Sequence, residues 1–194
     1  MTVETLPDIL KTDLSLLSIG LNPSLPSVLA GFYFANPRNR FWAALNASTL
    51  LSEPVTPGPD CMQQLLEREG FGFTDLVKRP TRGAGELRVK DYRQAAPGLR
   101  ALIERYQPRF AWFHGKLAYK NFIRYGGMDS GGDDWGLQRQ RMGETRIFVT
   151  PNPSPANAVF SLSDLVTWYN RLARCLSSLT PASLHGQLPA IGNR

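Results

Sequence analysis

Cysteine is scarce in this chain, which has 194 residues and only two cysteines, Cys61 and Cys175. Two thiols are too few for a disulfide-rich scaffold, a zinc ribbon or an iron–sulfur cluster with four thiolate ligands. Histidine is equally rare, since His114 and His185 are the only two. No cluster of Cys, Asp or Glu at metal-ligand spacing accompanies either histidine. We therefore expect a protein that binds no metal and no other cofactor.

Long hydrophobic runs are also absent. No apolar stretch approaches the roughly 20 residues that cross a bilayer. Residues 1–19 lack the basic start and the sustained apolar core of a secretory signal. The apolar fraction of 42% and the charged fraction of 20% are typical of a globular chain in water. We expect a cytoplasmic monomer without membrane contact, with one domain over residues 1–176 and a flexible tail over 177–194, where helical periodicity is lost.

Basic side chains are in moderate excess and unevenly placed. The chain has 22 Lys+Arg against 16 Asp+Glu, a net charge of +6. Residues 78–93 (KRPTRGAGELRVKDYR) concentrate basic side chains and also contain Pro80, Gly83 and Gly85, so we predict a mobile basic loop there. Charge alone does not distinguish a solvated surface loop from a loop that contacts phosphates, and it supports both interpretations equally.

Short apolar runs alternate with helical patterns along the chain. Residues 14–21, 110–113 and 147–150 are apolar and are followed by Asn-Pro, His-Gly and Pro-Asn-Pro, which is typical of buried parallel strands. Helical periodicity lies between and after them. We predict an α/β fold of three layers, with a central, mostly parallel sheet of about four to five strands flanked by helices. Ligands of such folds bind outside the carboxyl ends of the strands.

Three helix starts can be predicted from side chains that cap the backbone. Asp60 with Gln63 can begin the helix that carries the Leu-Leu pair after them. Pro97 suits the first turn of the next amphipathic helix. Ser161 and Asp164 have the spacing of a capping box at the start of the last helix.

Four motifs stand in a characteristic order over residues 14–176. They are Gly-Leu-Asn-Pro-Ser at 20–24, GFYFANPRNRFW at 31–42, GFTDLVKRPT at 72–81 and Asn-Pro-Ser-Pro at 152–155. Together they resemble the uracil DNA glycosylase superfamily and, within it, the mismatch-specific uracil/thymine DNA glycosylase (Mug/TDG) family. The resemblance implies that the chain flips uracil out of DNA and hydrolyses its N-glycosidic bond, leaving an abasic site for base excision repair.

The resemblance implies a catalytic role for Asn22. Most superfamily members have an aspartate at this position, which activates or orients water. An asparagine cannot accept a proton, but its amide oxygen can hold a water in line with the sugar. A carboxylate can assist by offsetting the positive charge of the sugar or by activating water, and Asp75 and Asp91 are the two candidates. The plainer alternatives are that Asn22 forms a turn, Asp75 orders its loop and Asp91 caps a helix.

The same resemblance implies a base pocket formed by Gly20, Leu21, Ser24 and Phe34. Backbone N–H groups around Leu21 can stabilise the departing base anion, and Phe34 can stack on the flipped base. Ser24 stands where strictly uracil-specific relatives have a tyrosine, so we expect room for 5-substituted pyrimidines. The alternative for Phe34 is a core position.

Contacts with DNA are expected from two groups of residues. The first is the loop Asn152, Pro153, Ser154, Pro155 and Ala156, which would hold the phosphates beside the flipped nucleotide. Ala156 is small for the apolar wedge that relatives place here, so we expect weak dependence on the opposite base and activity on single strands. The second group is the basic residues Arg40, Arg82 and Arg88.

Two alternatives to a uracil glycosylase stay open. One is a relative that removes hypoxanthine or xanthine, and the other is a DNA-binding module without activity. We expect a monofunctional enzyme, because Lys116 is the one lysine near a strand end that could attack the sugar, and a structural role is expected for it.

Overall fold

A central β-sheet organises the computed structural model, in which residues 5–129 and 132–178 are described. Its five strands lie in the order β2-β1-β3-β5-β4. The four neighbours β2, β1, β3 and β5 pair in parallel, and β4 pairs antiparallel with β5. This confirms the predicted three-layer α/β fold with a mostly parallel sheet. The strands are β1 (Leu16–Gly20), β2 (Phe71–Asp75), β3 (Phe110–His114), β4 (Gly136–Met142) and β5 (Thr145–Thr150).

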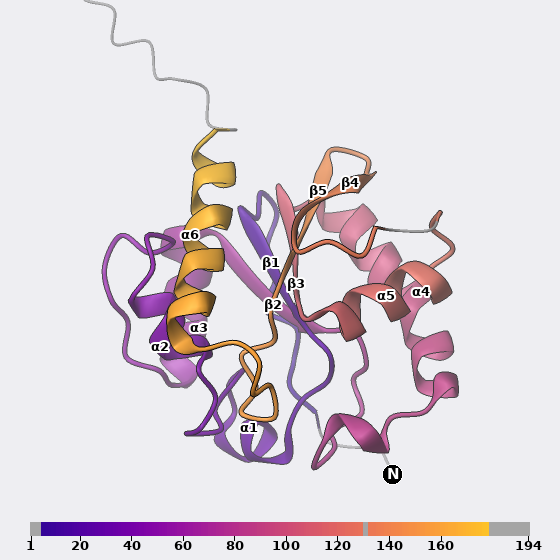
Figure 1. The fold of residues 1–194 in the computed structure, drawn as a ribbon, viewed down its shortest axis with the longest axis horizontal. Coiled ribbons are helices and arrows are strands. Elements are labelled where there is room, and N and C mark those ends of the chain that lie inside the picture. The colour runs from indigo at the N-terminus through magenta and orange to yellow at the C-terminus, as the bar shows by residue number, and fades with distance from the viewer. Residues whose placement is uncertain (1–4, 130–131, 179–194) are drawn as a thin grey trace, which may run out of the picture.

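Helices cover both faces of the sheet. One face carries α2 (Phe41–Asn46), α3 (Pro59–Glu69) and α6 (Leu162–Ser177), and the other carries α4 (Val89–Tyr106) and α5 (Lys116–Tyr125) (Figure 1). Residues alternate between these faces, so that Leu16 packs in the core on the α6 side and Leu17 in the core on the α4 side. Because both faces are covered, every residue of β1, β2 and β3 is buried.

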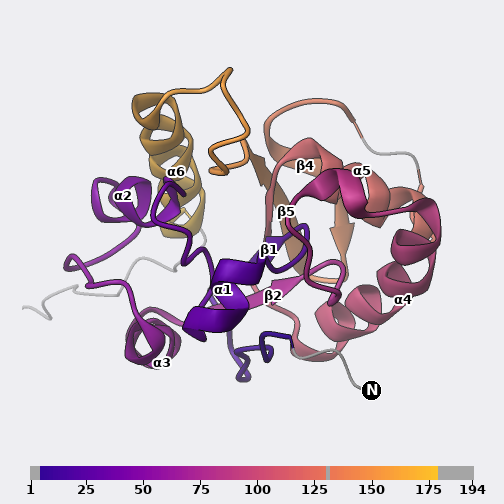
Figure 2. The same ribbon diagram turned by 90° about the horizontal axis from the view of Figure 1, so that it is seen from below.

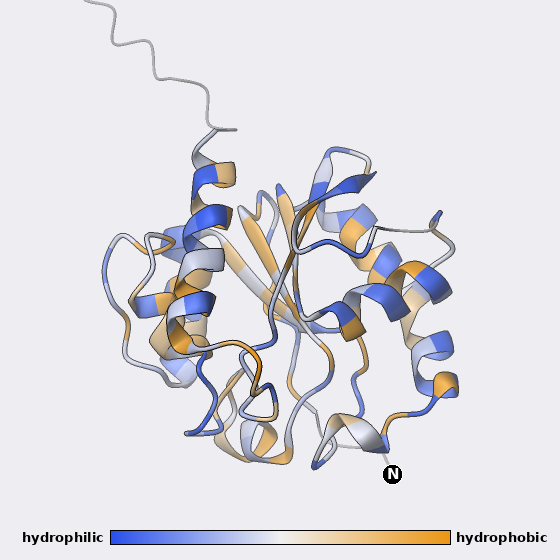
Figure 3. Cartoon of the chain, in the orientation of Figure 1, coloured by the Kyte–Doolittle hydropathy of each residue, from blue (hydrophilic) through white to orange (hydrophobic). Residues whose placement is uncertain are grey.

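The loops that follow the parallel strands gather at one edge of the sheet. This edge faces the viewer in Figure 2, where the short helix α1 (Leu25–Ala30) lies in front of β1. The turn η1 (Ala84–Glu86) lies in the loop after β2. In Figure 3 the strands are largely orange, and much of the chain at this edge is blue or pale. The apolar runs therefore form the core, and polar residues collect where the strands end.

Two predicted helix starts are wrong. Helix α4 begins at Val89, so Pro97 lies inside it and not in its first turn. Asp91 in its first turn caps the start of the helix, because its carboxylate accepts the backbone N–H of Arg88 at 2.7 Å. The basic segment predicted as a loop over 78–93 thus ends in a helical turn. Helix α3 is capped by Gly58, and Asp60 lies in its first turn.

The last helix begins as predicted. Ser161 Oγ accepts the backbone N–H of Asp164, and the Asp164 carboxylate accepts that of Ser161 at 2.8 Å. The helix runs to Ser177, and residues 179–194 of the expected tail lie outside the described residues. No helix in the described part of the chain is both long and apolar enough to cross a membrane.

We predict that Ser161→Ala destabilises the fold by about 1 kcal/mol, because the cap of α6 is lost. Urea unfolding of both proteins would measure the difference. Ser163→Ala, at an exposed position inside the same helix, is the matched control and should be neutral or slightly stabilising. Equal midpoints for Ser161→Ala and wild type would show that the capping box contributes no stability.

Candidate active site

The loop after β1 is fastened to the loop after β2. Leu76 and Val77 donate their backbone N–H groups to Gly20 and Leu21, each at 2.9 Å, so the ladder between the strands continues past their ends. The side chain of Asn22 extends this connection. Its Nδ2 donates to the backbone oxygen of Arg79 at 3.0 Å and to Thr81 Oγ1 at 2.8 Å. The amide nitrogen is thus occupied, and Oδ1 is the atom of this side chain that remains to accept a hydrogen bond from a ligand.

Ser24 begins helix α1 at the rim of the same region. Its Oγ accepts the backbone N–H of Ser27 at 3.3 Å and lies 2.9 Å from Ser27 Oγ. Ser27 Oγ also accepts the backbone N–H of Ala35 at 3.1 Å. Two short hydroxyl side chains therefore join the loop after β1 to the segment that carries Phe34.

Phe34 has an unusual backbone conformation and a partly exposed ring. Its φ angle is +58°, in the left-handed region that costs a residue other than glycine about 1 kcal/mol or more. The ring stacks on Phe41 with 4.1 Å between centroids and meets the edge of His114 at 5.0 Å. One face of Phe34 is therefore covered by the core, and the residue borders a cavity.

Three residues at the ends of neighbouring strands form the floor of that cavity. Gly20 of β1 is in register with Asp75 of β2, and His114 is the last residue of β3 on the other side of β1. A Cβ on Gly20 would lie 2.1 Å from Asp75 Oδ1, so the carboxyl occupies the space that a side chain at Gly20 would take. His114 Nε2 is bonded to Ser18 Oγ at 2.8 Å. Within the described residues, Asp75 Oδ2 and His114 Nδ1 are buried without a hydrogen-bond partner.

Burial changes the pKa values of both floor residues. It raises the pKa of Asp75 from 3.8 to about 7, with Asp8 adding to the rise and Lys78 opposing it. It lowers the pKa of His114 from 6.5 to about 3, so the imidazole is neutral at pH 7. The floor thus has a carboxyl group with a pKa near 7 and a neutral imidazole, and both can form hydrogen bonds with a ligand.

The loop after β5 forms the opposite wall. Asn152 Oδ1 accepts the backbone N–H of Ser154 at 2.8 Å, which fixes the turn. Arg40 supports this loop from behind, because its guanidinium donates to the backbone oxygens of Ser154 at 3.0 Å, Asn157 at 2.7 Å and Phe160. Arg40 therefore holds the wall in place through its backbone.

These elements enclose a cavity of about 650 Å³ at the carboxyl edge of the sheet. Most of the residues expected from the sequence line it, namely Gly20, Leu21, Asn22, Ser24, Phe34, Asp75, Arg82, Asn152, Ser154, Pro155 and Ala156. Four others, Arg40, Asp91, Arg88 and Pro153, are not among its lining residues. The two carboxylate candidates are thus separated, since Asp75 borders the cavity and Asp91 does not.

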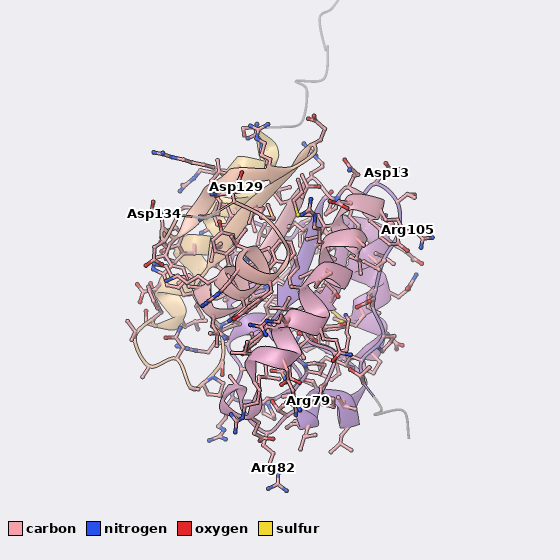
Figure 4. All side chains as sticks on the ribbon, turned by 90° about the vertical axis from the view of Figure 1, so that its right-hand side faces the viewer. Asp13, Arg79, Arg82, Arg105, Asp129 and Asp134 are labelled. Carbon is pink, nitrogen blue, oxygen red and sulfur yellow. The ribbon has the colours of Figure 1, made fainter. Side chains whose placement is uncertain are left out.

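Asp91 and Arg88 are engaged at the start of α4. The Asp91 carboxylate forms an ion pair with Arg79 at 2.9 Å, and this hydrogen bond lowers the pKa of Asp91. Arg88 donates to the backbone oxygen of Gly85 at 2.8 Å. Arg79 and Arg82 lie at the same end of the molecule, where Arg82 extends into solvent (Figure 4).

Comparison with known proteins agrees with this architecture. A family model described as the uracil DNA glycosylase superfamily matches residues 7–173. The chain belongs to the uracil DNA glycosylase superfamily. Its fold is also similar to a solution NMR structure of a candidate uracil DNA glycosylase from Methanosarcina acetivorans, with a TM-score of 0.54 and 20% identity over 87% of this chain and 97% of that chain. Members of the superfamily are DNA glycosylases, which are hydrolases, so the substrate is DNA.

Several residues that line this glycosylase site were not expected from the sequence, among them His114 and Leu6. His114 lines the cavity, although its position at the end of an apolar run favours a core residue. Leu6 also lines it, because the segment before β1 is held by a bond from Tyr33 Oη to the backbone oxygen of Pro7 at 3.0 Å. No group of three or more His, Cys, Asp or Glu able to hold a metal occurs in the described part of the chain.

We predict that Asp75→Asn gains stability relative to wild type as the pH rises from about 4 to about 7. Over this range the folded chain keeps the Asp75 proton, because its pKa is about 7, whereas the unfolded chain loses it near 3.8. The unfolded state then binds fewer protons, so the free energy of unfolding of wild type falls with rising pH. Asparagine removes this ionisation.

Urea midpoints of both proteins at about pH 4.5, 6 and 7.5 would test this. His114 acts in the opposite direction, since its folded pKa of about 3 makes stability fall as the pH drops below 6.5. That contribution is common to both proteins and cancels in the difference. A difference that stays constant across the range contradicts the prediction.

Proposed function

We propose that the chain is a mismatch-specific uracil DNA glycosylase of the Mug/TDG family, a monofunctional enzyme that flips uracil from DNA and leaves an abasic site. The single observation that carries this proposal is the cavity at the carboxyl edge of the sheet, which Asn22, Phe34 and the polar floor line together. A flipped base needs an aromatic face, hydrogen-bonding groups and a positioned water, and these residues supply them. Flipping costs least at a mispair, which favours mismatched substrates.

Hydrolysis requires a water near the sugar and a stabilised leaving group. Asn22 supplies the first, because its Nδ2 is held by Arg79 and Thr81 and its Oδ1 can hold the water in line. When the C1′–N1 bond breaks, its electron pair goes to the base and the sugar becomes positively charged. The water oxygen then bonds to C1′, and the proton that the water loses goes to the base anion. Backbone donors around Leu21 stabilise the base anion. Of the two carboxylate candidates, Asp75 borders the cavity and Asp91 does not.

Substrate breadth follows from the small residues at the rim. Ser24 is half-buried, and its hydroxyl is bonded to Ser27. A short side chain there leaves space for a substituent at position 5 of the pyrimidine. The enzyme would therefore accept 5-substituted uracils as well as uracil.

The loop after β5 would hold the DNA strand. Ser154 and Ala156 border the cavity, and hydroxyl and N–H donors of this loop can bind the phosphates beside the flipped nucleotide. Ala156 is exposed and too short to fill the space that a flipped base leaves in the stack. We therefore expect weak dependence on the opposite base and measurable activity on single strands.

We predict that Asn22→Ala lowers uracil release at least about 100-fold, since the positioned water is lost. The measurement uses oligonucleotides with uracil, 5-substituted uracil, thymine or hypoxanthine, as single strands and opposite G or A. Asn121→Ala changes a partly exposed asparagine on α5 outside the cavity lining; it is the matched control and should be fully active. Asp75→Ala should lower the rate more than Asp91→Ala.

Several outcomes would contradict this function. Full activity of Asn22→Ala would show that Asn22 does not position the water. A preference for hypoxanthine over uracil would favour a glycosylase that removes hypoxanthine or xanthine. Binding without release of any base would indicate a DNA-binding module. Covalent trapping of the enzyme on DNA by borohydride would contradict the monofunctional assignment. That assignment expects a structural role for Lys116, whose Nζ lies 3.3 Å from Asp133 Oδ1 and 4.5 Å from the centroid of the Trp135 ring.

We predict that Arg82→Glu weakens DNA binding and makes the plot of log affinity against log salt less steep by about one unit, without changing base preference. Arg82 borders the cavity and is exposed. Arg105→Glu is the matched control, because Arg105 lies at the opposite end of the molecule (Figure 4). Binding isotherms at several salt concentrations give both slopes, and equal slopes for the two variants would remove Arg82 from the DNA interface.

A further inference from the structure

The two orphaned polar atoms of the cavity floor belong to one face of the sheet. Gly20, its register partner Asp75 and the β3 residue His114 end three adjacent strands. Ser18 lies two residues before Gly20, so both point to the same face, and His114 shares this face because it reaches Ser18 Oγ. The Asp75 carboxyl lies over Gly20, on the strand between the two side chains. Asp75 and His114 therefore border the same floor from its two sides.

The hydrogen bonds of the described residues do not explain why Asp75 Oδ2 and His114 Nδ1 are buried. A buried polar group without a hydrogen bond is unfavourable, and such groups are rare in native proteins. Asp75 is 4% exposed and His114 is 2% exposed, yet within the described residues Oδ2 and Nδ1 have no partner. Both residues line the cavity. Two orphaned atoms that share one cavity indicate a ligand that supplies the missing hydrogen bonds.

The bonds already present restrict what His114 can offer. Its Nε2 is engaged with Ser18 Oγ, and a neutral imidazole carries one donor and one acceptor nitrogen. If the hydroxyl of Ser18 donates to Nε2, the ring proton is on Nδ1 and faces the cavity. Ser18 is then a positioning residue, since its hydroxyl holds Nε2 and leaves Nδ1 for the cavity.

We infer that His114 contacts the flipped base, with Nδ1–H donating to one carbonyl oxygen while the neutral carboxyl of Asp75 pairs with the adjacent ring N–H and the second carbonyl oxygen. This inference rests on the proposed function. The contacts are hydrogen bonds, and no proton is transferred. Together the floor offers a donor and an acceptor from Asp75 and a donor from His114.

This order of donors and acceptors selects a class of base. A pyrimidine-2,4-dione such as uracil presents acceptor, donor and acceptor along O4, N3–H and O2, which complements the floor at all three atoms. Cytosine presents an amino group and an unprotonated N3 in the first two places, and a neutral carboxyl meets these with its proton on the other oxygen, so the floor does not by itself separate uracil from cytosine. Hypoxanthine offers the N–H and one carbonyl but has a C–H where the third contact would be. His114 is thus the residue that favours uracil over hypoxanthine.

Burial favours the neutral form of both side chains, that of Asp75 up to about pH 7 and that of His114 above about pH 3. Burial raises the pKa of Asp75 to about 7 and lowers that of His114 to about 3. The rings of Trp112 and Phe41 pack against the imidazole with centroids 4.3 and 5.3 Å away, which keeps water from it. A hydrogen bond made in such surroundings is stronger than one made in water.

We predict that His114→Phe lowers kcat/KM for uracil about tenfold while that for hypoxanthine changes less, so the preference for uracil narrows. A lost donor opposite a base oxygen has about this effect. His114→Gln keeps a side-chain donor and should restore part of the preference. A loss of equal size for both bases would overturn the inference, because a merely structural role predicts it. The wild-type rates are measured first, so absence of activity on every base counts against the proposed function.

A second measurement does not depend on turnover. The chain has only two histidines, so protein labelled with ¹⁵N-histidine gives two sets of imidazole resonances. The inference expects the His114 proton on Nδ1 and a change of that resonance on addition of free uracil that is larger than the change with free hypoxanthine. A proton on Nε2, or no change at saturating uracil, would overturn it. Ser18→Ala should reduce the preference for the Nδ1 tautomer.

Discussion

The parallel pairing of β2, β1 and β3 is the constraint on which the site depends. Register places Asp75 beside Gly20, and the same ladder places His114 on the other side of β1. Because successive residues of a strand face opposite sides, a slip of one residue would turn either polar side chain away from the cavity. Gly20 is needed at the centre, because a Cβ there would meet the Asp75 carboxyl at 2.1 Å. The hydrogen bonds that stabilise the core therefore also define the floor of the cavity.

The aromatic layer beneath the floor gives these polar groups their properties. Phe41, Trp112 and Tyr169 surround the His114 ring with centroids 5.3, 4.3 and 6.4 Å away. Exclusion of water by these rings keeps the imidazole neutral, and burial likewise raises the pKa of Asp75. The unpaired polar atoms of Asp75 and His114 lie where a ligand can satisfy them, whereas Thr145 Oγ1 and Tyr169 Oη are buried without a partner among the described residues and do not line the cavity.

Much of this architecture is predictable from the chain, and the exceptions have physical causes. Apolar runs reveal β1, β3 and β5 because a strand covered on both faces is continuously apolar. Strand β4 has exposed residues at alternate positions and lies at the sheet edge, so it lacks that signal. Pro97 favours a helix start by its own chemistry, but the Asp91 cap begins α4 two turns earlier. His114 could not be assigned, because only the pairing of distant strands brings it to the same cavity as Asp75.

Tertiary contacts reduce the number of basic side chains near the cavity that are free to bind phosphates. Near the cavity, Arg79 is paired with Asp91, Lys78 with Asp8, and the Arg40 guanidinium with backbone oxygens of the loop after β5. These cations order loops, and their charge is partly compensated before any DNA is bound. Arg38 and Arg82 differ, since both line the cavity and no side-chain bond of theirs occurs among the described residues. Attraction for phosphates at this edge therefore depends on a few uncompensated cations and on backbone donors, and the net charge of +6 overstates it.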